Sequence, residues 1–63
     1  DYVWDIALKA AFEVAETALT KDDQRRDAAI AILKAEAKNL GKEIKDSDAR
    51  LLIEMAVAEI KNQ

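Results

Sequence analysis

The sequence has no cysteine and no histidine, so two side chains often used for metal binding and for catalysis near neutral pH are missing. Without cysteine, neither a disulfide nor a thiolate metal site can stabilise the chain. Carboxylates, lysines and one tyrosine remain as candidates for proton transfer. Glu13 and Glu16 share one helical face, which we interpret as a solvated face that lacks the dry pocket an acid or base needs. We therefore expect no enzyme activity and no cofactor.

Proline is also absent and Gly41 is the single glycine, whereas thirteen residues are alanine. This composition favours helix strongly over sheet. A chain of 63 residues has room for one domain. So short a chain buries only about 60% of the surface that its unfolded form exposes. We therefore predict one all-α domain over residues 1–63, with a thin margin of stability.

The sequence also lacks an excess of basic residues and any long apolar run. Ten basic and thirteen acidic residues give a net charge of −3, which disfavours binding to a nucleic-acid backbone. No apolar run approaches the ~18 residues of a membrane span, and no segment resembles a signal peptide. The chain begins Asp-Tyr-Val-Trp without methionine, which fits a piece excised from a longer polypeptide. Any membrane association would then depend on a segment outside this chain.

Apolar residues recur at helical spacing in three segments. We predict helices over about residues 2–19, 23–40 and 47–61, joined by short loops and packed as a small antiparallel three-helix bundle. Ile44 is predicted to close one end of the bundle. The residues predicted to face the core are Val3, Trp4, Ala7, Leu8, Ala10, Ala11, Val14, Ala15, Ala18 and Leu19, then Arg26, Ala29, Ile30, Leu33, Ala37 and Leu40, then Ala49, Leu52, Ile53, Ala56, Val57 and Ile60.

Short polar runs mark the ends of the second predicted helix. Thr20 has the spacing of a capping box with Asp23, and Asp22 or Asp23 is the alternative cap. Gly41, directly after Leu40, is the predicted left-handed residue that ends this helix.

Three polar residues, Asp46, Ser47 and Asp48, precede the third predicted helix. Each is a candidate N-cap, and the two carboxylates would also suit the positive end of the helix dipole. Asp46 and Asp48 have the D-x-D spacing of a calcium loop, but the further ligands, glycine and closing glutamate of an EF-hand do not follow. We therefore predict helix capping and no metal site.

Two other local features each have two interpretations. Arg25 and Arg26 could form an anion site, but the neighbouring Asp22, Asp23 and Asp27 favour charge pairing within the chain. For the aromatic N-terminus, a single tryptophan in so small a domain usually anchors the core. The alternative places the Tyr-Val-Trp run in the interfacial belt below a missing membrane segment.

Two apolar stripes have no place in the predicted core. Scattered exposed apolar residues are normal, but these follow i, i+4, i+7 spacing and place large residues next to alanine, as in surfaces that another helix approaches. We predict that they form a partner interface, most simply in a symmetric homo-oligomer. The stripes are Leu51, Met55 and Ala58 in the third helix, and Ala28, Ile32 and Ala35 in the second.

Several short runs carry a family likeness: Val14-Ala-Glu-Thr17, Ala31-Ile-Leu33, Ile44, Asp48 and Leu52-Ile-Glu-Met-Ala-Val-Ala-Glu-Ile-Lys61. The last contains an L-I-E-x-A-V motif. With these runs, the chain from about Ala11 to its C-terminus resembles the C-terminal region of phage holins of the LL-H family.

The resemblance implies a soluble tail that follows an N-terminal membrane helix, on the cytoplasmic side of the host cell membrane. Holins of this family assemble in that membrane and permit host lysis at a set time. Two departures stand out. Residues 20–26 have mixed charge where the family often has a loop rich in lysine and glycine, and the membrane span is absent.

Three function hypotheses follow. The first is a non-enzymatic interaction or oligomerisation module, of the kind found as a holin tail. The second is a small adaptor or inhibitor that binds one heterologous protein through the same stripes. The third is a designed bundle without function, as the alanine-rich, proline-free composition would allow. Two competing stripes, Asn39 near a helix end and an uneven surface charge argue against a design.

Overall fold

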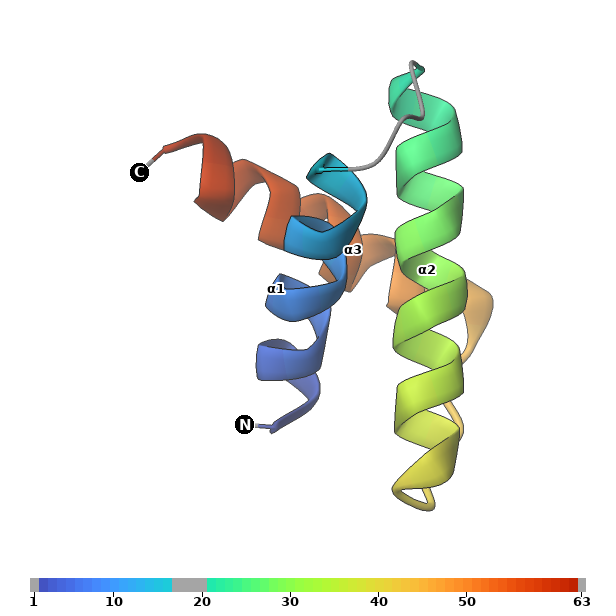
Figure 1. The fold of residues 1–63 in the computed structure, drawn as a ribbon. Helices are drawn as coiled ribbons and strands as arrows, with labels where there is room; N and C mark the ends of the chain where they lie inside the picture. Colours follow the sequence, from blue (N-terminus) through green and yellow to red (C-terminus); the bar gives the residue numbers. More distant parts are fainter. Residues whose placement is uncertain (1, 17–20, 63) are drawn as a thin grey trace.

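The computed structural model describes residues 2–16 and 21–62, and within them the chain forms three α-helices and no strand. α1 covers Tyr2–Ala15, α2 covers Asp22–Asn39 and α3 covers Asp46–Lys61 (Figure 1). The predicted all-α class and the three-helix bundle are therefore confirmed. Residues 17–19 of the first predicted helix and the candidate cap Thr20 lie outside the described part of the chain.

The helices are not all aligned. α1 and α2 run antiparallel, whereas α3 crosses both of them on one side (Figure 1), and each helix contacts the other two. The predicted antiparallel arrangement is therefore correct for α1 and α2 and wrong for α3. On the buried face of α3, Ala49 and Ala56 flank Ile53, and such small residues let a crossing helix approach its neighbours closely.

The core is built mostly from alanine. Among the described residues, Leu33 and Ile53 are the largest side chains that are fully buried, and no polar or charged residue is buried. Larger residues, including Trp4 and Ile44, are half-buried and pack around this core, as predicted for both. Because alanine removes little apolar area from water, much of the stabilisation depends on a few large side chains. The buried residues are Ala7, Ala10, Ala11, Val14, Ala29, Leu33, Ala37, Ala49, Ile53 and Ala56.

Two residues of the predicted core are exposed instead. Leu40 keeps 59% of its surface accessible, and Ala15 is also exposed. At its C-terminal end α2 extends beyond the start of α1 (Figure 1), so Leu40, the C-cap of α2, reaches past the packed part of the bundle. Helical spacing alone does not report where a neighbouring helix stops.

The end of α2 follows the prediction. Gly41 has a φ of +81°, the left-handed conformation that glycine adopts without steric cost. The N–H of Gly41 donates to the carbonyl of Lys38, and the N–H of Lys42 donates to the carbonyl of Ala37, both at 2.9 Å. These two bonds form a Schellman motif, which satisfies carbonyl groups that the helix end would leave unpaired.

The predicted side-chain caps at the helix starts are wrong. The N-cap residues are Lys21 for α2 and Lys45 for α3, and neither makes a side-chain capping hydrogen bond. Each helix begins one residue earlier than predicted, so the candidate caps lie inside the first turn. Their carboxylates stabilise the helix starts through the dipole instead. These residues are Asp22 and Asp23 in α2, and Asp46 and Asp48 with Ser47 between them in α3.

Candidate functional site

α3 has two apolar faces. One packs into the core through Ala49, Ile53 and Ala56. Because side chains follow one another at 3.6 residues per turn, Leu51, Met55 and Ala58 fall on the opposite side of the helix. Leu51 is 58% exposed and Met55 is 51% exposed, and Ala58 is exposed as well. We call these three residues the outer face of α3.

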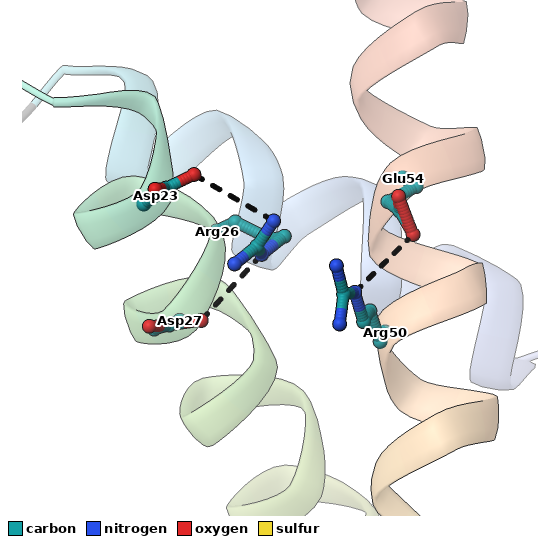
Figure 2. Close-up of polar contacts among 5 residues, drawn as sticks. All are labelled: Asp23, Arg26, Asp27, Arg50 and Glu54. Atoms are coloured by element: carbon teal, nitrogen blue, oxygen red, sulfur yellow. Dashed lines mark ion pairs between the residues drawn. The ribbon is translucent and has the colours of Figure 1, made fainter.

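Charged residues border the outer face of α3. Glu54 lies on one margin and forms an i, i+4 ion pair with Arg50, with 3.6 Å between Arg50 Nε and Glu54 Oε1 (Figure 2). Asp48 and Glu59 lie on the other margin and are exposed. The result is a narrow apolar strip with charged edges, an arrangement in which a partner could bury the strip while the edges stay hydrated.

The second predicted stripe lies elsewhere. Ala28 and Ile32 are half-buried and pack against the core, and only Ala35 is exposed. Glu36, one turn after Ile32, pairs with Lys9 of α1 at 3.4 Å between Nζ and Oε1, so this flank of α2 faces α1. The expectation that Ala28 and Ile32 face away from the core is therefore wrong, because both pack against the core cluster.

The six residues predicted as one interface thus belong to two regions. Leu51, Met55 and Ala58 remain together on an exposed helix face, whereas Ala28 and Ile32 pack against the core. Only the outer face of α3 keeps the exposure that a partner surface requires.

Comparison of the chain with protein families, characterised proteins and solved structures finds no match. Within residues 2–16 and 21–62, none of the helices has both the length and the apolar character that a membrane span requires. In the same residues, no group of three or more acidic side chains is placed to hold a metal ion. The chemistry of the surface is therefore what bears on function.

A groove of about 340 Å³ lies where all three helices meet, beside the C-terminal end of α1. Its walls are aliphatic and its rim carries both signs of charge. Sequence periodicity does not reveal such a groove, because it is made by residues from three separate helices. We call the aliphatic lining residues the walls, Ala11, Val14, Ala15, Ala29, Val57 and Ile60, and the charged lining residues the rim, Asp22, Asp23, Arg25, Arg26, Glu54 and Lys61.

Arg26 lies at the rim of this groove and is held by acids of its own helix. Its guanidinium lies 3.7 Å from Asp23 Oδ1 and 3.5 Å from Asp27 Oδ1 (Figure 2). The predicted charge pairing within the chain is confirmed for Arg26. Both acids are largely exposed, so each pair contributes at most about 1 kcal/mol. The Asp27 pair is made by Arg26 Nε, which is buried and forms no hydrogen bond.

Two aromatic residues in α1 are exposed, Tyr2 of the Tyr-Val-Trp run and Phe12, which the sequence gave no role. Phe12 is 49% exposed and Tyr2 is 45% exposed. The Tyr2 ring lies 5.0 Å from Lys42 Nζ, a cation–π distance that ties the start of α1 to the turn after α2. Phe12 stands at the edge of the wide apolar arc of its helix, which was the available signal that it lies between core and solvent.

Proposed function

We propose that this protein is a non-enzymatic helical interaction module that associates through the outer face of α3. One observation carries the proposal: Leu51 and Met55 are exposed on the side of α3 opposite its buried residues. A helix that only covers a core needs one apolar stripe. A second stripe on the far side keeps large apolar side chains in water, and a partner would remove them from it.

The proposed partner is a second copy of the chain. A symmetric pair uses the same face on both copies, so no further binding surface is required. The margins of α3 carry both acidic and basic side chains, such as Glu54 and Arg50. Two copies that pair through this face therefore do not bring only like charges together. The outer face is small beside the roughly 1,200 Å² that a stable interface buries in total. We therefore expect association at high protein concentration.

The resemblance to holins of the LL-H family gives this association a biological setting. The run that carries most of the likeness, Leu52 to Lys61, lies within α3 and includes Met55 and Ala58 of the outer face. In that setting the module is a tail on the cytoplasmic side of the host cell membrane, and its association brings membrane segments of neighbouring chains together for lysis.

Sedimentation equilibrium over a wide concentration range tests the proposal. The untagged chain is expected to associate, and Leu51→Glu combined with Met55→Glu is expected to abolish the part of that association made through the outer face of α3, without changing the helix content measured by circular dichroism. The matched control, Gln24→Glu with Ala31→Glu, adds the same charge to exposed positions of α2 and should associate like the parent. A Leu51/Met55 variant that associates normally would exclude the outer face of α3 as the contact.

A second candidate function is a small adaptor or inhibitor that binds one heterologous protein. Met55 favours it, because the flexible, polarisable methionine side chain adapts to differently shaped partners. In this case the chain alone sediments as a monomer at every concentration. A pull-down from lysate then enriches one stoichiometric partner, and the Leu51→Glu, Met55→Glu variant loses it.

A further inference from the structure

Phe12 and the groove at the end of α1 form a second surface, separate from the outer face of α3. We propose that two copies of this chain join at this surface, with Phe12 of each copy inserted into the groove of the other. The contact involves residues of all three helices but none of Leu51, Met55 and Ala58. Its success or failure is therefore independent of the function proposed above.

Phe12 is placed beside the groove without lining it. The α1 wall of the groove is formed by Ala11, Val14 and Ala15, and Ala15 is three residues after Phe12. Residues three apart on a helix are surface neighbours, with about 5–6 Å between their Cβ atoms. Phe12 is 49% exposed, so its ring stands next to the opening and faces solvent.

The groove has the size and the lining for one aromatic ring. Its volume of about 340 Å³ is at the lower end of the range for ligand pockets, roughly 300–1,000 Å³. Short side chains such as Ala15 and Ala29 leave the space open, and Val57 and Ile60 supply apolar walls. A phenylalanine side chain would exchange water for aliphatic contacts on several sides.

Arg26 favours an aromatic over an aliphatic occupant. Its guanidinium lines the groove and is held by Asp23 and by Asp27, and the Asp27 pair is made by Nε. Planar guanidinium groups stack on aromatic rings and are attracted by their π-electrons. A ring in the groove would therefore gain a contact with Arg26 that an aliphatic side chain would not.

The adjacency of ring and groove makes the surface self-complementary. Because Phe12 and the groove lie next to each other, one two-fold axis can place the ring of each copy in the groove of the other, and the contact is complete with two copies. The charges agree with such a pairing. Lys9, which also pairs with Glu36, and Glu16 neighbour Phe12 on α1. The opposing rim carries three acids and three bases, so neither copy presents charges of a single sign to the other.

The test uses the full chain carrying Leu51→Glu and Met55→Glu, so that only the groove contact is measured. Sedimentation equilibrium of this parent is expected to show a monomer–dimer equilibrium. Phe12→Ser removes the ring and Ala15→Leu fills the groove, and each should weaken the dimer on the order of 30-fold, the loss expected for an interface hot spot. The matched control Ala31→Leu adds the same side chain on an exposed part of α2 and should leave the equilibrium unchanged.

Mixing the two variants makes the test specific. The Phe12→Ser chain has an open groove and no ring, whereas the Ala15→Leu chain has a ring and no open groove. Neither can form a good contact with itself, but a mixed pair restores one insertion and should dimerise more strongly than either variant alone. A parent that stays monomeric, a Phe12→Ser variant that dimerises like the parent, or a mixture no stronger than its components would each overturn the proposal.

Discussion

The antiparallel pair α1–α2 and the crossing helix α3 use the same sequence signal in opposite ways. Both α2 and α3 carry a second apolar stripe beside their core stripe. In α2 that stripe is largely covered, because Ala28 and Ile32 pack against the core on the flank that meets α1. In α3 the stripe of Leu51, Met55 and Ala58 stays exposed. The spacing of a second stripe thus does not tell whether it is covered, and the fold decides whether a neighbour within the chain covers it.

The difference follows from how the helices cross. α2 meets α1 on one flank through the Glu36–Lys9 pair and α3 elsewhere through the ion pair of Lys34 with Asp46. A helix between two neighbours needs a wide apolar arc. α3 crosses α1 and α2 on one side (Figure 1), so a single face contacts both. Its other face is then free for a partner outside the chain.

The largest expected effect is the difference in free energy of unfolding between substitutions on the buried face and on the outer face of α3. Ile53→Ala removes a fully buried side chain and should lower the free energy of unfolding by about 2–5 kcal/mol, a large share of what so short a chain has. Leu51→Ala removes a side chain of similar size from the exposed face and should change it by less than about 0.5 kcal/mol. Urea denaturation of both variants at low protein concentration measures the difference. Equal losses would mean that α3 does not have a buried and a free face.

An intermediate effect compares the second stripes of α2 and α3. Ile32→Ala should lower the free energy of unfolding by about 1–2 kcal/mol, less than a fully buried isoleucine because Ile32 is only half-buried. Met55→Ala, on the outer face of α3, should leave the stability of the monomer almost unchanged. Thermal unfolding followed by circular dichroism at low protein concentration provides the measurement. A loss at Met55 as large as that at Ile32 would place the outer face of α3 within the packed structure.

The sequence predicted the helices better than their arrangement. Apolar spacing located all three helices, and the Leu40-Gly41 step located the end of α2, because both depend on interactions a few residues apart. The crossing of α3 depends on packing among residues far apart in the sequence, such as Leu33 and Ile53 of the core cluster, which helical periodicity does not encode. The same limit explains Leu40, which has core spacing but extends past its neighbours, and Ile32, whose covering helix could not be foreseen.

The candidate surfaces were predictable to different degrees. The outer face of α3 belongs to one helix, so its i, i+4, i+7 spacing revealed it directly. The groove takes residues from three helices, and no pattern within one segment records it. The predicted N-caps of α2 and α3 were wrong for a local reason. Several acidic residues in a row can each serve as a cap, and a shift of one residue turns a cap into a first-turn charge.

The smallest expected effect compares the two ion pairs that join α2 to its neighbours. Lys9–Glu36 ties α2 to α1, and Lys34–Asp46 ties it to α3. Double-mutant cycles with alanine should give coupling energies of about 0.2–1 kcal/mol for such surface pairs. The Lys9–Glu36 value should be the larger, because the acids differ most in exposure, 35% for Glu36 against 83% for Asp46, whereas the lysines differ less, 63% for Lys9 against 42% for Lys34. Charges nearer the protein interior are screened less, so the Lys9–Glu36 coupling should also persist better in about 1 M salt, where the Debye length falls to about 3 Å. A larger and more salt-resistant coupling at Lys34–Asp46 would mean that α3 is held more firmly than α1, and that the crossing helix is the more fixed of the two neighbours of α2.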